Sequence, residues 1–237
     1  MNDEHLWETE NWTLQVRQLT KELPKFSNKL KLTLILRHSE RFEPNEIGDG
    51  IELHLTETGH KIAHLFGQKL PKGRQVRIYH SIASRCEETA IDILEGFKSK
   101  GGNGKIEGVL KPLHVLGVDR ELFIKELKER ILVEFLRRWM AGLYPPHKLN
   151  PLSNYCQNAA KVIWDRFSTL PAGGMAIHVT HEILIMALRF GWFGLPPDNY
   201  WVNFLGGFAF AFTNNRILLL DNKQFMQVEY PYWWKSR

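Results

Sequence analysis

Three short, largely apolar runs along the chain predict buried strands. Each is too short for a typical helix and is followed by polar residues, as expected where a strand reaches the edge of a sheet. Two later stretches, Phe208–Phe212 and Arg216–Leu220, flank Asn214-Asn215 and have the composition of an antiparallel hairpin. The three apolar runs are Leu32–Leu36, Val76–Tyr79 and Met175–Thr180.

Between these runs, apolar positions recur at helical spacing. Thr56 can cap one helix, and Ser84 with Glu87 has the spacing of a capping box for another. The glycine-rich stretch 98–105 is predicted to be an exposed, mobile loop. The predicted helices occupy 11–23, 56–71, 84–94, 120–140, 154–167 and the segment after His181, which is expected to end at Gly191.

This alternation of strands and helices predicts an α/β fold. We expect a three-layer sandwich, in which a mostly parallel central sheet carries helices on both faces. A length of 237 residues suits a single domain spanning 1–237, with the helix around 11–23 as an accessory element. The 43% apolar and 24% charged residues are those of an ordinary globular protein.

Charge and cysteine content narrow the expected partners and location. The formal net charge is +5, but Lys and Arg are spread along the chain, so nucleic acid is a less favoured partner than a small phosphorylated substrate. Two cysteines suit a reducing cytoplasm. The acidic first residues do not resemble an export signal, and the apolar tract Phe204–Phe212 has about half the roughly 20 residues of a membrane helix. We therefore expect a cytoplasmic protein without a membrane partner, and the sequence leaves its oligomeric state open.

Polar clusters follow the three predicted strands. Arg37, His38 and Arg41 follow the first strand, the segment 81–85 follows the second, and His181-Glu182 follows the last. In open α/β sheets, ligands bind beyond the carboxyl ends of the strands. If these strands are parallel neighbours, their polar residues meet in one pocket.

The residues in these clusters suit phosphoryl transfer. An imidazole can attack phosphorus and form a covalent intermediate. Guanidinium groups match phosphoryl oxygens in shape and stay charged, so they can stabilise the transition state. The sequence contains no close His, Cys or carboxylate spacing typical of a zinc site, so we expect neither a metal nor another cofactor.

Four motifs in this order resemble the histidine phosphatase superfamily, whose fold is that of the phosphoglycerate mutases. Arg37-His38-Ser39 stands for the family's Arg-His-Gly, and its continuation RHSERFEP is similar to the RHGxRxP of the acid phosphatase branch. LTETGHKIA resembles the family's LTxxGxxxA, SIASRCEETA resembles its Ser, Arg and Thr-Ala pattern, and HVTHE supplies the late histidine. The acid phosphatase branch usually has Asp after that histidine and the mutase-like branch Gly, so Glu182 leaves the branch open.

The resemblance implies a role for each matching residue. His38 would be the nucleophile, and His181 would contact the transferring group. Glu182 is the expected proton donor, with Asp119 and Glu121 as rivals. The expected phosphate ligands are Arg37, Arg41 and Arg85.

Less specific candidates are expected to be structural. His178 lies inside a strand and is expected to pack or hydrogen-bond in the sheet, whereas His80 could line the pocket. Cys86 and Cys156 lack the arginine six positions later that a cysteine phosphatase needs, so both are expected to be buried.

The predicted function is phosphomonoester hydrolysis through a phosphohistidine. The enzymatic alternative is a phosphoglycerate-type mutase, which returns the phosphoryl group to a substrate instead of water. Ser39 in place of glycine also leaves open an impaired member of the family that acts as a binding protein, because its side chain could crowd the phosphate.

Overall fold

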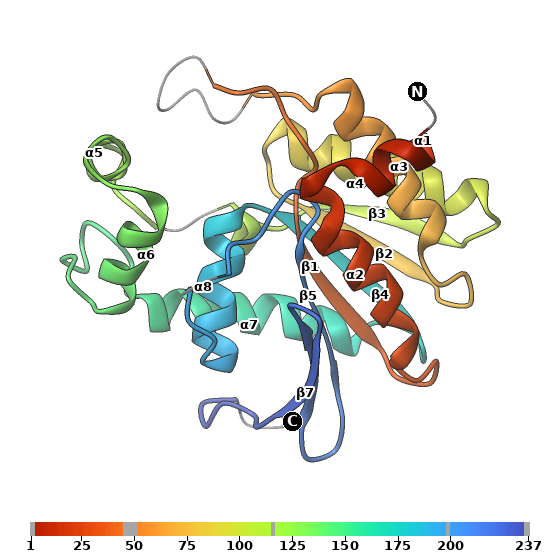
Figure 1. The fold of residues 1–237 in the computed structure, drawn as a ribbon. Coiled ribbons are helices and arrows are strands. Elements are labelled where there is room, and N and C mark those ends of the chain that lie inside the picture. The colour runs from red at the N-terminus through yellow and green to blue at the C-terminus, as the bar shows by residue number, and fades with distance from the viewer. Residues whose placement is uncertain (1–2, 45–51, 115–116, 198–199, 235–237) are drawn as a thin grey trace.

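The computed structural model describes residues 3–44, 52–114, 117–197 and 200–234. Its centre is a seven-stranded sheet with the order β3-β2-β4-β1-β5-β6-β7 (Figure 1). The first four strands in this order run parallel, and β5, β6 and β7 are added antiparallel to their neighbours. The strands are β1 (Leu32–Arg37), β2 (Val76–His80), β3 (Gly104–Val109), β4 (Met175–Thr180), β5 (Gly207–Phe212), β6 (Ile217–Asp221) and β7 (Gln224–Val228).

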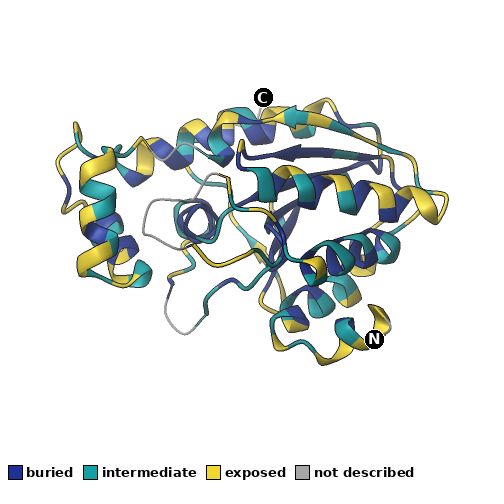
Figure 2. Cartoon of the chain, turned by 90° about the horizontal axis from the view of Figure 1, so that it is seen from above, coloured by how far each residue is buried: buried dark blue, intermediate teal, exposed yellow. Residues whose placement is uncertain are grey.

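Helices cover both faces of this sheet, and most of their buried residues face it (Figure 2). One apolar layer packs α2, α3 and α4 on the sheet, and the other packs α7 and α8 on the opposite face, with α6 packed against α8. The three-layer α/β prediction is confirmed, with a sheet that is mixed in direction. The helices are α1 (Asp3–Thr9), α2 (Leu14–Glu22), α3 (Glu57–Lys69), α4 (Ser84–Ser99), α5 (Arg120–Glu129), α6 (Leu132–Met140), α7 (Leu152–Ser168) and α8 (Glu182–Phe193), with short 3₁₀ turns η1 (Asn11–Thr13), η2 (Leu23–Lys25) and η3 (Lys111–Leu113).

The strand register brings the three polar clusters together. β4 lies between β1 and β2 and is parallel to both, and the pairs Arg37↔Thr180 and His80↔Val179 end the two ladders at almost the same level. The residues that follow these three strands therefore leave the same edge of the sheet. This adjacency is the condition under which the sequence predicted a single pocket.

Several predicted boundaries are wrong. The pattern 120–140 forms two helices, because Arg130 and Ile131 are extended and let α6 turn its apolar face, including Phe135 and Trp139, toward the core. The predicted loop 98–105 is shorter than expected and covers only 100–103, since α4 continues to Ser99 and β3 begins at Gly104. Ser84 is the first residue of α4 and does not cap it.

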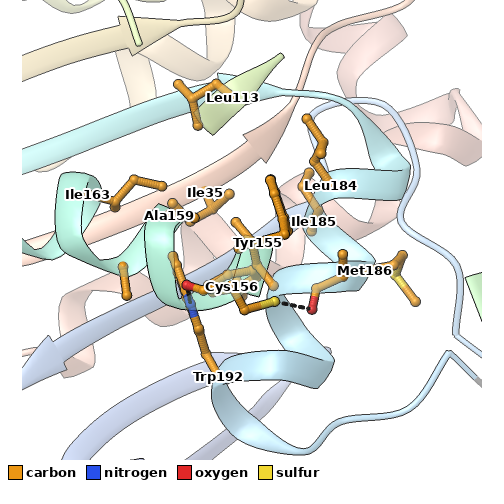
Figure 3. Close-up of a cluster of buried hydrophobic side chains, with 14 of the residues drawn as sticks. Ile35, Leu113, Tyr155, Cys156, Ala159, Ile163, Leu184, Ile185, Met186 and Trp192 are labelled. Atoms are coloured by element: carbon orange, nitrogen blue, oxygen red, sulfur yellow. Dashed lines mark hydrogen bonds between the residues drawn. The ribbon is translucent and has the colours of Figure 1, made fainter. Parts of the chain in front are cut away.

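Gly191 does not end α8. The helix continues to Phe193 and stops at Gly194, whose left-handed backbone (φ 69°) suits glycine. A Cβ on Gly191 would lie 2.2 Å from the sulfur of Cys156, so the glycine permits close packing of α8 on α7. Figure 3 shows this contact region, where the Cys156 thiol donates to the carbonyl of Ala187 (3.4 Å).

The N-terminal segment packs on the sheet as α2 between η1 and η2, with α1 preceding it. Thr56 caps α3 as predicted, since its hydroxyl accepts from the N–H of Gly59 (2.9 Å). The β5–β6 hairpin is also confirmed, and β7 extends it. Within the described ranges, none of the helices has both the length and the apolarity needed to cross a membrane.

Candidate active site

His38 lies directly beyond β1 with its ring buried in the pocket. Its main chain is fixed on both sides: its N–H donates to Thr180 (2.9 Å), and its carbonyl accepts from Leu205 (3.2 Å). The ring atom Nδ1 lies 2.7 Å from the carbonyl of Ser39. A carbonyl only accepts, so Nδ1 carries the hydrogen and Nε2 keeps its lone pair.

The lone pair of His38 points at Arg85. The Nε of Arg85, in the first turn of α4, donates to Nε2 of His38 (3.1 Å). Burial lowers the pKa of His38 well below its ordinary value, and electrostatic interactions with His181, Arg85 and Arg37 act in the same direction. The ring is therefore neutral at physiological pH and available as a nucleophile.

His181 stands on the other side of Arg85. Nη2 of Arg85 lies 3.1 Å from Nδ1 of His181, and Nε2 of His181 lies 2.9 Å from the hydroxyl of Ser81. Arg85 can only donate, so Nε2 of His181 carries the hydrogen that the Ser81 hydroxyl accepts. Burial, and then the charge of Arg85, lowers the pKa of His181 to about 3. Arg85 thus lies between two neutral imidazoles, whose ring centroids are 5.6 Å apart.

Arg37 reaches the same pocket from the end of β1 and is already engaged. Its Nη2 donates to Oε1 of Glu182 (3.1 Å), and its Nε lies 3.1 Å from Oε2. Its Nη1 donates to the carbonyl of Val202 (3.1 Å), and its guanidinium carbon lies 4.3 Å from the ring centre of Phe204. Burial lowers the pKa of Arg37, while Glu182 opposes that shift. The pocket therefore contains a carboxylate bound to one of its predicted phosphate ligands.

Arg41 lies at the margin of this group. Its Nη1 donates to the carbonyl of Phe42 (2.7 Å) and lies 3.4 Å from a carboxylate oxygen of Glu43. Its charge nevertheless lowers the pKa values of Arg37 and Arg85, so it acts on the pocket electrostatically. The structure thus links His38, Arg85 and His181 by hydrogen bonds and pairs Arg37 with Glu182, while Arg41 lies at the margin.

The two rival proton donors, Asp119 and Glu121, lie at the start of α5. Asp119 caps α5 by accepting from the N–H of Leu122 (3.0 Å) and pairs with Lys148 (3.3 Å). Glu121 is exposed in the first turn of α5. Among the hydrogen bonds and ion pairs of the described residues, neither carboxylate reaches the pocket, whereas Glu182 lies inside it.

Ser39 turns its side chain away from the pocket. Its buried hydroxyl donates to the carbonyl of Gly59 in α3 (2.7 Å), and its N–H donates to the hydroxyl of Thr89 in α4 (3.0 Å). A Cβ on Gly59 would lie 2.1 Å from the carbonyl oxygen of Glu40, so the segment after His38 packs directly on α3. The serine thus fastens the nucleophile segment to two helices. Gly59 and Thr89 lie in the motifs LTETGHKIA and SIASRCEETA, but the motifs alone do not indicate these contacts.

Three other residues near the pocket were missed or only partly anticipated. Ser81 contacts His181, and His80 places Nδ1 2.9 Å from the carbonyl of Ser81. His114 follows η3, lowers the pKa of His181 by its charge, and has a buried Nδ1 without a hydrogen-bond partner among the described residues. No motif indicated His114. It lies near the pocket because η3, which precedes it, is bound to β4: the hydroxyl of Thr180 donates to the carbonyl of Leu113 (2.6 Å).

The remaining candidates are structural. His178 is buried in β4 and stacks on Tyr79 with ring centroids 5.0 Å apart. Cys86 and Cys156 are buried, free thiols, and burial raises the pKa of each to about 12. In the part of the chain that the structure describes, no group of three or more His, Cys, Asp or Glu side chains is arranged to hold a metal ion.

Solved structures with a similar fold include phosphatases. A phosphoserine phosphatase from Entamoeba histolytica, solved with 3-phosphoglyceric acid, has a TM-score of 0.56 and 16% identity, over 83% of this chain and 96% of the other. A mycobacterial glucosyl-3-phosphoglycerate phosphatase has a TM-score of 0.51 and 16% identity, over 76% and 88% of the two chains. An open reading frame product of Mycobacterium tuberculosis has a TM-score of 0.53 and 19% identity, over 80% and 95%. At these identities the likeness establishes the fold.

The sequence also matches a family model. No curated protein matches the chain. The model of the histidine phosphatase superfamily (branch 1) matches residues 33–209, which contain all the pocket residues described above. This protein belongs to the histidine phosphatase superfamily.

Proposed function

We propose that the protein hydrolyses small phosphomonoesters through a phosphohistidine intermediate on His38. One observation carries this proposal: the Nδ1–H of His38 is held by the carbonyl of Ser39, so the lone pair on Nε2 faces Arg85. A neutral imidazole fixed in this tautomer, beside arginines, is suited to attack phosphorus. The phosphatases among the structural neighbours support the same class of reaction.

The arginines and His181 of the pocket bind the phosphoryl group before the attack. Arg85 donates to Nε2 of His38 in the unliganded pocket. A phosphoryl oxygen is a stronger acceptor than imidazole, so it takes over this donor and leaves the lone pair free. Arg37 and His181 contact the other oxygens, and Arg41 adds positive charge from the margin.

The reaction then proceeds in two displacements. Nε2 of His38 attacks phosphorus, the bond from phosphorus to the ester oxygen breaks, and Glu182 gives that oxygen a proton. A water molecule next attacks phosphorus and loses a proton to Glu182, and the bond from phosphorus to Nε2 of His38 breaks, which releases inorganic phosphate and restores neutral His38. The carbonyl of Ser39 stabilises the positive charge that the ring carries while it is phosphorylated.

The orientation of the Ser39 hydroxyl favours an active enzyme over an impaired binding protein. This hydroxyl is bonded to the carbonyl of Gly59 in α3, so it is directed away from the site where phosphate would bind. We further propose that the reaction needs no metal, because the arginines supply the positive charge, and that the protein works in the reducing cytoplasm, where both thiols stay free. Activity is expected to survive prolonged treatment with a chelator, and loss of activity that a divalent ion restores would contradict metal independence.

The test is a screen of sugar phosphates, nucleotides, phosphopeptides and inositol phosphates, followed by trapping of the intermediate. His38→Ala should abolish phosphate release, and brief exposure of the native protein to labelled substrate should give acid-labile, base-stable label on His38. The control His147→Ala changes an exposed histidine and should retain full turnover. Full turnover in His38→Ala, or label on another residue, would refute the mechanism. Formation of an isomer without phosphate release would identify a mutase.

A further inference from the structure

The contact between Arg37 and Glu182 joins a predicted phosphate ligand to the predicted proton donor. The two residues come from neighbouring strand ends, since Arg37 ends β1 and Glu182 begins α8 after β4. Their side chains are only 12% and 18% exposed. The pair therefore occupies the pocket and is shielded from solvent, so its interaction is stronger than that of a surface ion pair.

The hydrogen bonding of Arg37 leaves little capacity for a further anion. Nη2 is bonded to Glu182, Nη1 is bonded to Val202, and stacking on Phe204 limits rotation of the guanidinium plane. Nε lies 3.1 Å from the second carboxylate oxygen but makes no well-aligned hydrogen bond within the described residues. A phosphoryl group that binds Arg37 through Nε and Nη2 must take the place of the carboxylate.

Charge decides the direction of this exchange. A phosphate dianion carries about twice the charge of a carboxylate and forms stronger paired hydrogen bonds with a guanidinium. Arg85 also interacts electrostatically with Glu182, and it too is engaged by the incoming phosphate. His181 is the preceding residue, and the buried thiol of Cys86 also interacts electrostatically with Glu182. The displaced carboxylate would face a dianion without its cation, which favours its protonated form.

We propose that substrate phosphate displaces Glu182 from Arg37, and that the displaced carboxylate takes up a proton from solvent. The inference rests on the proposed function, for which this proton is the one that the leaving oxygen needs. In the unliganded protein Glu182 is paired with Arg37, so on this proposal the general acid forms only when substrate is bound. The same contact keeps Arg37 in position until then.

The experiment counts protons taken up when an anion binds to the full-length protein. Tungstate is a suitable probe because it is a tetrahedral dianion that carries no ionisable proton near neutral pH. Calorimetric titrations in buffers of different ionisation enthalpy give the number of protons bound per tungstate. His38 and His181 could also take up protons, so the quantity of interest is the difference between the native protein and Glu182→Gln.

We expect Glu182→Gln to take up about one proton fewer than the native protein and to bind tungstate roughly tenfold more tightly, because a neutral amide competes weakly for Arg37. Glu87→Gln, an exposed change in the first turn of α4, is the matched control and should behave like the native protein. Equal proton uptake in Glu182→Gln and the native protein would overturn the proposal. Weaker tungstate binding by the variant would also overturn it, because Glu182 would then only position Arg37.

The outcomes separate this inference from the proposed function. Tungstate binding requires no turnover, so the proton count can be measured in His38→Ala as well as in the native protein. Turnover that depends on His38 without a proton difference would leave the phosphatase proposal standing and remove the exchange. If the protein hydrolyses none of the screened esters but the proton difference is found, the exchange would stand and the phosphatase proposal would be removed.

Discussion

Replacing His178 by leucine is expected to make the fold more resistant to acid. His178 is fully buried in β4 between β1 and β2, and neither ring nitrogen has a hydrogen-bond partner in the described part of the chain. Burial, helped by the charge of Arg166, lowers its pKa from 6.5 to about 3. The folded protein therefore excludes a proton that the unfolded chain binds readily.

The size of the effect follows from this pKa difference. Above pH 6.5 the imidazole is neutral in both the folded and the unfolded state, so its protonation does not change the free energy of unfolding. As the pH falls from 6.5 toward 3, the unfolded state binds more protons and the folded state loses stability. At about pH 4.5, which is about two units below the pKa of the unfolded state, the folded protein has lost about 3 kcal/mol of stability through this histidine. At neutral pH, leucine should also stabilise the fold by about 1 kcal/mol, because it removes an unpaired buried polar group.

The assay is urea unfolding of the native protein and His178→Leu at about pH 7 and about pH 4.5. The loss of unfolding free energy between the two pH values should be about 3 kcal/mol smaller in the variant. His38 and His181 contribute to acid sensitivity in both proteins, so their effects cancel in this comparison. His147→Leu, at an exposed position, should show the native loss. An equal loss in His178→Leu and the native protein would show that His178 is not held neutral by burial.

Three further substitutions test the scaffold and the site. Arg74 is 2% exposed and donates to four main-chain carbonyls, so Arg74→Met should lower the free energy of unfolding by about 3–5 kcal/mol in urea; a loss below about 1 kcal/mol would contradict this role. Gly59→Ala would place a Cβ 2.1 Å from the carbonyl of Glu40 and should lower kcat/KM at least roughly tenfold by moving the segment after His38. Gly73→Ala, which meets no atom within 4 Å, is its control, and equal kinetics in the two variants would reject the packing argument. Glu182→Gln should slow hydrolysis of an alkyl phosphate roughly a hundredfold and that of para-nitrophenyl phosphate much less, because only the poor leaving group needs the proton. Equal losses on both substrates would count against Glu182 as the donor, and the same selective loss in Asp119→Asn would transfer the role.

The location of the pocket could be predicted from the sequence. Leu32–Leu36 and Met175–Thr180 are local signals of buried strands, and the polar residues after each are adjacent in the chain. Once the strands are parallel neighbours, His38, Arg85 and His181 must lie at one edge of the sheet. Local hydrophobic pattern and short motifs identify the strands and the polar residues after them, because each depends on residues close in sequence, whereas the adjacency of the strands comes from the fold.

The helix boundaries show where local pattern becomes insufficient. Gly191 resembles a helix end, but its missing side chain accommodates Cys156 of α7. Apolar residues recur at helical spacing throughout 120–140, yet the backbone is extended at Arg130 and Ile131. This break between α5 and α6 lets α6 face the core. In both cases a contact with a distant helix overrides the local preference.

The electrostatic state of the pocket was decided only by the tertiary structure. The sequence placed Arg37 and Glu182 in the site, but their ion pair joins positions 145 residues apart and depends on the register of β1 with β4. The hydroxyl of Ser39 could have crowded the phosphate, and only the packing of α3 shows that it is bonded to Gly59. A sequence specifies which chemical groups are present, whereas the pairing of those groups depends on distances between residues that the fold alone brings together.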